Sequence, residues 1–497
     1  MLEKLEFQQV VEETLKVKRA TRCMTMYQFV LAMVLALYVG FSRLNHVRFL
    51  AREPMLVGIL KVLRLPPQCT FWRFLASLHL QIARQLLEVQ RVMRQRVWEA
   101  AHVRLTAVTL DTDTTVHTLF GHQMGARKGY NPKNKGKKSY QPILTFLAET
   151  REYIAGELHN GDRPSGAQIA RHLESVFAAL PQSVPTIYAR ADSGFYCWEA
   201  VEAYENQGCQ CVLSARKTAR LVDELKGADW KGSPRTDADG QCEFRYQPEG
   251  WGQAYRFLAL RYEKRAKPSE SNETEQYQLF DTPEYTYRVF VTNMKDPVYM
   301  LVWFYNQRAG AENLIKEANN DAGLAAYPSA RWAMNCNHFQ LAMLAYNLNC
   351  WLMLFNREEK ASTSELKHTT LATSRLRFLF LAQNLASRRP GGSQLQRPLS
   401  GTGNLPTIDG SAEGNYRRQE RIRAGADGTP ALLNTRVHKN LCTTSPVRPT
   451  SYQRRARLST EWDDPSGRSK SEGLAQRSTA APCMHNPGCR GSFQLCR

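Results

Sequence analysis

Three acidic residues between positions 113 and 312 constrain the fold of this chain more than any other feature. Asp113 and Asp192 each end an apolar, strand-like run, whereas Glu312 lies on a helical pattern, one turn after Arg308. A fold that brings these elements together places three carboxylates side by side. Hard divalent cations prefer oxygen ligands, and two such ions about 4 Å apart can stabilise the attacking and leaving oxygens of a phosphodiester. The pattern therefore predicts a two-metal site that acts on DNA strands.

Two further residues on the same helical pattern suit a phosphate backbone. Tyr305 and Arg308 stand at i and i+3, ahead of Glu312, in a Tyr-x2-Arg-x3-Glu spacing. Residues three apart lie on one helix face, and Arg and Tyr side chains commonly contact DNA phosphates. Asp111 shares the strand face of Asp113 because side chains alternate along a strand, so Asp111 is the alternative first acid.

The spacing resembles the signature of bacterial insertion-sequence DDE transposases, with Asp113 and Asp192 in the places of the first two acids. The resemblance covers about residues 1 to 382 and extends through several short matches: Gly121-His122-Gln123, Gly129-Tyr130-Asn131, Lys138-Ser139-Tyr140 and Tyr346-Asn347-Leu348. The sequence departs from the signature at one position. The family usually has a Lys seven residues after the Glu, where this chain has Asn319, and Lys316 is the candidate substitute.

The resemblance implies a cut-and-paste transposase that excises and reinserts double-stranded DNA at terminal inverted repeats. It implies two Mg²⁺ ions, replaceable by Mn²⁺, with Asp113 bridging both and with Asp192 and Glu312 each completing one site. A homodimer would hold the two DNA ends together. The expected location is the cytoplasm of a bacterium, at the nucleoid.

The charge of the chain favours the same kind of partner. The net charge of +20 points to a polyanion such as nucleic acid, although residues 361–497 account for much of it, with 21 Lys and Arg against 9 Asp and Glu. The loop from Arg127 to Lys138 carries six basic residues beside Tyr130. We expect DNA contacts from Arg127, Lys128, Lys137, Lys138, Tyr305, Arg308 and Lys316. A merely solvated loop is the alternative interpretation.

Apolar periodicity makes residues 1–102 a helical domain that we expect to bind DNA ends or a second copy of the chain. Its basic residues Arg91, Arg94 and Arg96 are candidates for gripping DNA, with a solvated helix face as the alternative. Met24 to Phe41 is uncharged and about long enough to span a membrane. We expect a buried helix there and no membrane contact, because the segment contains polar side chains and no second span follows.

The rest of the chain divides into four parts. Strands and helices alternate over residues 103–212, which predicts a mixed α/β layer, the first part of an RNase-H-like catalytic core. Residues 213–298 are rich in short strand patterns and form a β insertion. Helical periodicity returns over 299–360 as the second part of the core. Residues 361–497 contain the remnant of a C-terminal helix and a tail without regular periodicity, which we expect to be disordered.

The tail also suggests a frameshift near residues 382–384. Codons for Leu385 to Leu399 can spell W-R-H-A-G-R-V-G-V-S-Y-S-D-H in another frame, which resembles the usual C-terminus of the family. A scrambled C-terminus leaves an inactive DNA-binding remnant as the alternative function. A plain nuclease, which cuts but does not join, is a third hypothesis.

Overall fold

The computed structural model describes residues 1–17, 24–263, 285–356 and 369–379. All of them belong to one compact unit, Met1–Pro430. Part of the expected β insertion, residues 264–284, lies outside the described residues, and so does the tail for which we expect disorder and a frameshift. The helices are α1 (Phe7–Thr14), α2 (Met26–Tyr38), α3 (Val47–Leu50), α4 (Pro54–Ile59), α5 (Gln68–Ser77), α6 (Leu80–Ala100), α7 (Gly166–Ala179), α8 (Trp198–Asn206), α9 (Ala219–Gly227), α10 (Val298–Asn306), α11 (Ala309–Asn320), α12 (Trp332–Phe355) and α13 (Leu371–Ser374).

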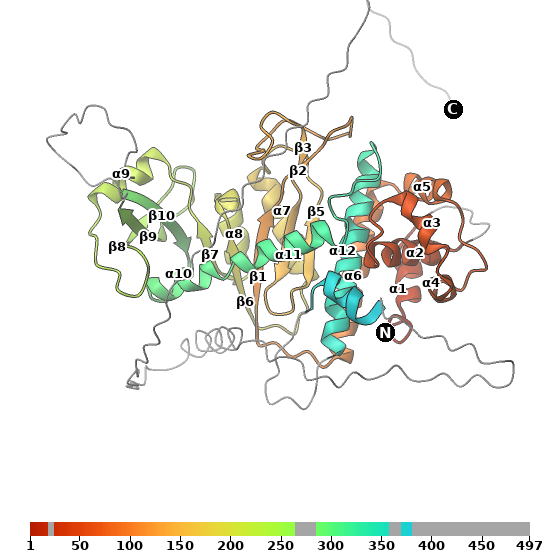
Figure 1. Cartoon of the computed structure of the whole chain (residues 1–497). Coiled ribbons are helices and arrows are strands. Elements are labelled where there is room, and N and C mark those ends of the chain that lie inside the picture. Colours follow the sequence, from red (N-terminus) through yellow and green to blue (C-terminus); the bar gives the residue numbers. More distant parts are fainter. Residues whose placement is uncertain (18–23, 264–284, 357–368, 380–497) are drawn as a thin grey trace, which may run out of the picture. The chain divides into compact units, whose positions relative to one another are not determined.

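The strands form one large sheet and one small ribbon (Figure 1). The large sheet has the order β5-β4-β1-β6-β7-β10-β9-β8, and the ribbon pairs β2 with β3. The strands are β1 (Ala107–Thr114), β2 (His117–Thr118), β3 (Ser139–Tyr140), β4 (Ile143–Leu147), β5 (Tyr153–Glu157), β6 (Thr186–Ala191), β7 (Gln210–Ser214), β8 (Gly240–Tyr246), β9 (Tyr255–Glu263) and β10 (Tyr285–Thr292).

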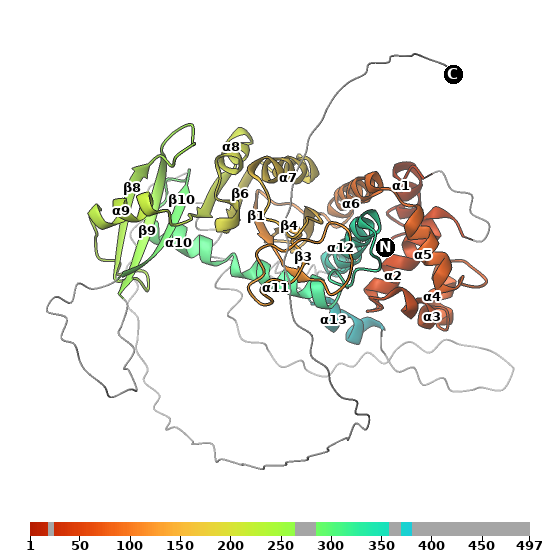
Figure 2. The ribbon, with the colours of Figure 1, turned by 90° about the horizontal axis from the view of Figure 1, so that it is seen from above.

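The pairing within the large sheet defines the fold. β1 and β6 are parallel, as are β6 and β7, whereas β4 and β5 run antiparallel to their neighbours. Helices α7 and α8 cover one face, and α10 and α11 cover the other (Figure 2). This is a mixed α/β, RNase-H-like fold, as the sequence predicts. β10 pairs with β7, and β9 and β8 follow, so the β-rich block between residues 213 and 298 extends the same sheet.

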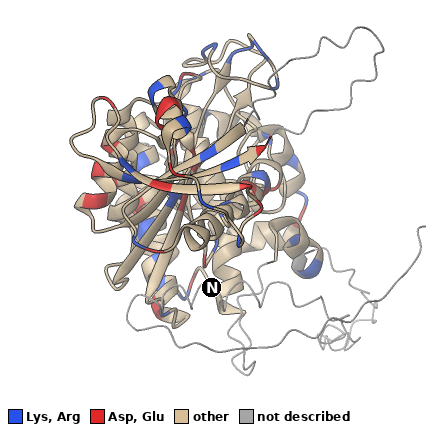
Figure 3. Ribbon diagram, turned by 90° about the vertical axis from the view of Figure 1, so that its left-hand side faces the viewer, with Lys and Arg blue, Asp and Glu red and all other residues tan. Residues whose placement is uncertain are grey.

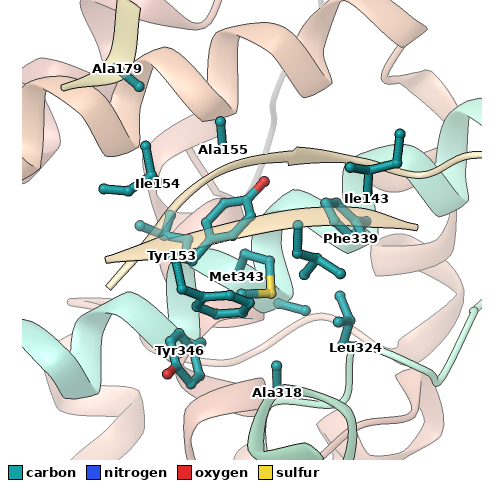
Figure 4. Packing of buried hydrophobic residues seen from close by; sticks show 14 of the residues in the cluster. Ile143, Tyr153, Ile154, Ala155, Ala179, Ala318, Leu324, Phe339, Met343 and Tyr346 are labelled. Carbon is teal, nitrogen blue, oxygen red and sulfur yellow. The ribbon is translucent and has the colours of Figure 1, made fainter. Parts of the chain in front are cut away.

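Helix α12 is the centre of the packing between the sheet and the N-terminal helices. Most of its 24 residues are buried, so it has no face exposed to solvent. Phe339 and Met343 of this helix lie beside Tyr153 of β5 (Figure 4), and Tyr346 packs edge to face on Phe146 of β4. The Tyr153 and Phe339 rings meet edge to face with centroids 6.3 Å apart. Aromatic pairs in this geometry stabilise beyond their buried area, so α12 holds the sheet edge firmly.

The uncharged segment from Met24 to Phe41 contains α2, which has 13 residues, ten of them buried. Thr25 and Gln28 form a capping box that begins the helix. Among the described helices, none is long and apolar enough to cross a membrane. The buried-helix interpretation is therefore confirmed.

A buried ion pair joins α6 to the strand edge. Arg94 Nε lies 3.3 Å from Glu152 Oε1, and both side chains are 0% exposed. Trp98 and Trp351 donate to the two Glu152 oxygens, and Arg94 donates to the carbonyls of Ala179 and Tyr153. The expectation that Arg94 contacts DNA is therefore wrong, because its guanidinium is buried and pairs with Glu152.

The neighbouring basic residues are also engaged within the chain. Arg96 donates to the Leu5 carbonyl and pairs with Glu6, whereas Arg91 pairs with Glu88 at the surface. None of the three predicted residues on α6 thus presents an unpaired charge to DNA.

We predict that Glu152→Gln lowers the free energy of unfolding by about 3–5 kcal/mol, because it leaves the Arg94 charge buried without a counterion. Glu88→Gln is the matched control, since Glu88 pairs with an arginine of the same helix in solvent. It should cost less than about 1 kcal/mol. Urea unfolding of both variants measures the difference, and equal losses would contradict the prediction.

Candidate active site

Asp113 and Asp192 lie at the same edge of the sheet. Asp113 is the penultimate residue of β1, and Asp192 directly follows β6. The two strands are parallel, and their register pairs Thr112 with Ala191, the residues immediately before the two acids. Asp192 Oδ1 accepts a hydrogen bond of 2.8 Å from the Gly194 backbone and so begins a short 3₁₀ turn. Local pairing thus brings together two carboxylates that are distant in sequence.

Arg308 connects Asp113 to the third acid. Its Nη1 donates to Asp113 Oδ2 at 2.8 Å, and its Nη2 lies 3.8 Å from Glu312 Oε1. The guanidinium is 13% exposed and Asp113 is 11% exposed, whereas Glu312 is 66% exposed. Arg308 follows α10 and precedes α11, so the expectation that Tyr305, Arg308 and Glu312 share one continuous helix is wrong.

The break between these helices is slight. Gln307 and Arg308 keep right-handed helical backbone angles, but hydrogen bonds to the third preceding residue, such as Arg308 N–H to the Tyr305 carbonyl, replace the regular helical pattern. Glu312 consequently falls in the first turn of α11, where the helix dipole favours an acidic side chain.

The electrostatics of Asp113 differ from those of a surface acid. Burial raises the pKa of Asp113 to about 6, and the charge of Asp192 acts in the same direction, while Arg308 opposes both. Burial lowers the pKa of Arg308, but the charges of Asp113, Tyr305 and Asp192 outweigh it and raise that pKa overall. The two aspartates therefore lie close enough to repel one another, and Arg308 compensates them only in part.

The alternative first acid is committed elsewhere. Asp111 accepts two hydrogen bonds of 2.7 Å from Arg190, one on each oxygen, and both side chains are buried. Arg190 also donates to the Phe304 carbonyl at the end of α10. This fork occupies both Asp111 oxygens, which supports Asp113 as the first acid. The sequence offered no signal for the pairing, because Arg190 is a single charge in an apolar run.

The remaining candidates on α10 and α11 divide by exposure. Tyr305 is buried, with its ring centroid 4.7 Å from that of Phe290. Lys316 is exposed one turn after Glu312. Asn319, at the position of the missing family Lys, accepts a hydrogen bond of 2.8 Å from His117 Nε2 through its Oδ1. The structure therefore leaves Lys316 as the basic side chain of this helix face.

The basic loop between β2 and β3 is exposed. Lys128, Lys137 and Lys138 all face solvent, and Arg127 pairs with Asp162 at 2.6 Å. Figure 3 shows Lys and Arg along the loops at the top of the view. The sequence contains no acidic residue between positions 118 and 140. This loop thus carries a local excess of positive charge.

A cavity of about 960 Å³ lies beside the end of α11. Its walls come from the N-terminal helical part, from the segment after β2 and from residues 319–328. The described residues that line it include no acid, and their polar members are mostly neutral: Ser42, Asn45, Gln68, Thr118, Gln123, Asn319 and Asn320, with Arg43. A negatively charged strand would meet no repulsion from these walls.

The acids suit a divalent metal by chemistry, although they are not gathered as a finished site. Among the described residues, no group of three or more His, Cys, Asp or Glu side chains is placed to hold an ion. Arg308 instead contacts two of the three acids. Three carboxylates, two of them mutually repelling, are nevertheless the oxygen donor set that Mg²⁺ or Mn²⁺ prefers.

The raised pKa of Asp113 predicts a pH-dependent stability in the presence of a chelator. Its folded value of about 6 exceeds the ordinary 3.8, so between these values the folded chain binds more protons than the unfolded chain. Stability due to this group therefore falls as pH rises. Relative to Asp113→Asn, the wild type should lose about 2 kcal/mol of unfolding free energy from about pH 4.5 to about pH 7.

Urea unfolding at both pH values provides the measurement. The exposed Asp223, which pairs with Lys226 at the surface, supplies the control variant Asp223→Asn. A difference between wild type and Asp113→Asn that does not change with pH would contradict the prediction.

Two solved transposase structures match part of this chain. A piggyBac transposase synaptic complex with hairpin DNA, solved by cryo-electron microscopy, is 12% identical, with a TM-score of 0.39 over 74% of this chain and 75% of that chain. A Mos1 transposase paired-end complex with left transposon end is 13% identical, with a TM-score of 0.16 over 42% of this chain and 67% of that chain. A comparison with curated proteins finds no match.

The family comparison covers most of the chain. Residues 1–389 match the family described as Transposase DDE domain group 1. Such transposases cleave and join DNA strands and use divalent metal ions, in agreement with the acids at the edge of the sheet. The chain belongs to this DDE transposase family.

Proposed function

We infer that this transposase performs cut-and-paste transposition of a bacterial insertion sequence, with hydrolysis and strand transfer at its terminal repeats. The proposal rests on two observations: Asp113 and Asp192 stand at the same sheet edge, and Arg308 contacts both Asp113 and Glu312. The same proposal includes a homodimer that holds the two DNA ends together. It also includes a location in the bacterial cytoplasm, at the nucleoid.

Asp113, Asp192 and Glu312 would hold two Mg²⁺ ions, for which Mn²⁺ can substitute. When bound, these ions lower the pKa of the attacking water or 3′-hydroxyl and stabilise the leaving 3′ oxygen. The raised pKa of Asp113 supports this assignment, since a buried acid beside a second acid gains most from added positive charge.

The other residues position DNA. Arg308 presents a planar guanidinium that binds a phosphate through two hydrogen bonds, and the Tyr305 ring beneath it restricts its movement, with the guanidinium carbon 5.8 Å from the ring centroid. Lys316 continues the positive surface along α11. Lys128, Lys137 and Lys138 contact the backbone of the same duplex from the β2–β3 loop, with Arg127.

We predict that Asp192→Asn and Glu312→Gln each reduce cleavage and joining by more than about 100-fold, since even groups outside a metal's ligand set are worth about 10–100-fold. Both variants should still bind DNA. The substrate is a fragment that carries the ends of the element encoding the chain, with Mg²⁺ or Mn²⁺ supplied, and strand products are resolved on denaturing gels.

The surface variant Asp223→Asn is the control. It removes an exposed acid that pairs with Lys226 and is none of the three candidate acids. Cleavage without joining by the wild type would indicate a nuclease. Binding without either reaction would indicate an inactive remnant with a scrambled C-terminus. Full activity in both acid variants would refute the three-carboxylate site.

We predict that replacing Lys137 and Lys138 by Gln weakens binding to all duplexes alike. Each lost phosphate contact should reduce the slope of log affinity against log salt by about 1. Lys226→Gln is the matched control, because Lys226 is an exposed lysine paired with Asp223. An unchanged salt slope in the double variant would show that the loop is only solvated.

A further inference from the structure

Arg308 occupies the place where two of the acids would share a cation. Its two terminal nitrogens reach different carboxylates, Asp113 at 2.8 Å and Glu312 at 3.8 Å. The guanidinium is itself largely buried. Asp113, Asp192 and Glu312 carry three negative charges when all are ionised. The single positive charge of Arg308 compensates only part of this charge.

The two contacts differ in strength. The Asp113 contact has hydrogen-bond length, whereas 3.8 Å to the exposed Glu312 is an ion pair without a hydrogen bond. Rotation of the Arg308 side chain away from the acids therefore has to break the hydrogen bond to Asp113 and the looser ion pair with Glu312. Tyr305 also contacts Arg308, with the guanidinium carbon 5.8 Å from the centre of its ring.

Arg308 and a divalent cation compete for the same oxygens. Asp113 Oδ2 accepts the hydrogen bond from Arg308, and a divalent ion at this acid would face the guanidinium charge at close range. Two positive charges a few ångströms apart in a largely buried site repel strongly. Arg308 then needs another anion, and a DNA phosphate offers two acceptor oxygens in the geometry that a guanidinium matches.

We propose that Arg308 is a movable counterion that leaves Asp113 and Glu312 for a DNA phosphate, so that binding of DNA and of divalent metal is mutually dependent. Without DNA, Arg308 holds the acids and weakens metal binding. With DNA, the phosphate draws Arg308 away and exposes the acids to the ions. The inference rests on the proposed function, because it assumes that these acids hold the metal.

The test measures Mn²⁺ affinity of the full chain by electron paramagnetic resonance of free Mn²⁺, with and without duplex DNA. The duplex carries one end of the encoding element, already cleaved at its terminus, so that no further cleavage alters it. Wild-type affinity for Mn²⁺ should rise about tenfold when DNA is added, within the usual range of coupling between two sites. Arg308→Gln should bind Mn²⁺ about tenfold more tightly than wild type without DNA, and added DNA should change its affinity little.

Three variants make the result decisive. Lys226→Gln removes an exposed positive charge that pairs with Asp223 and belongs to neither proposed site, so its Mn²⁺ affinity without DNA should equal that of the wild type. Arg308→Lys keeps the charge but offers one contact in place of two, and should show intermediate coupling even if Arg308→Gln folds poorly. Asp113→Asn should lose Mn²⁺ binding in both conditions.

The outcomes separate the two proposals. If added DNA does not change the Mn²⁺ affinity of the wild type, the movement of Arg308 from the acids to a phosphate is overturned. The same holds if DNA raises the Mn²⁺ affinity equally in the wild type and in both Arg308 variants. Either result leaves the proposed metal site intact. Mn²⁺ binding that is unaffected by Asp113→Asn would instead overturn the proposed metal site itself.

Discussion

The arrangement of the acids depends on the buried fork between Asp111 and Arg190. These residues face one another in the register of the parallel strands β1 and β6, and Arg190 also binds the last turn of α10 through the Phe304 carbonyl. A shift of one residue between the strands would leave both charges buried without partners, at a cost of several kcal/mol. The fork therefore fixes the register that places Asp113 beside Asp192. It also fixes the end of the helix from which Arg308 and Glu312 follow.

Burial of charge decreases stepwise from this fork toward solvent. Asp111 has a complete partner in Arg190, and Asp113 shares Arg308 with Glu312. Glu312 stands in solvent at the start of α11. The inner pair is structural, because nothing remains for a ligand to satisfy. The outer acids are incompletely compensated, as the raised pKa of Asp113 indicates, and this imbalance makes them suited to binding cations.

Features with a local cause could be predicted from the sequence. The strands and helices predicted to alternate over residues 103–212 are present, and the uncharged segment at 24–41 forms the buried α2, because apolar patterning alone specifies such elements. The sequence does not indicate the break before Arg308, since Gln307 and Arg308 are good helix formers. It also does not indicate that Arg94 is buried, because its partner, Glu152, lies far away in sequence. The three candidate acids themselves remain predictions.

Asn319 shows how one departure from a family pattern fits its surroundings. Burial lowers the pKa of His117 to about 4, so the ring is neutral near pH 7 and has one N–H. Tyr327 contacts His117 Nδ1, and Asn319 Oδ1 contacts Nε2, which suits a ring that accepts from the tyrosine and donates to the amide. A lysine at position 319 has no acceptor for that N–H. Asn319 therefore joins α11 to β2, and the exposed basic side chain on this helix is Lys316, one turn nearer Glu312.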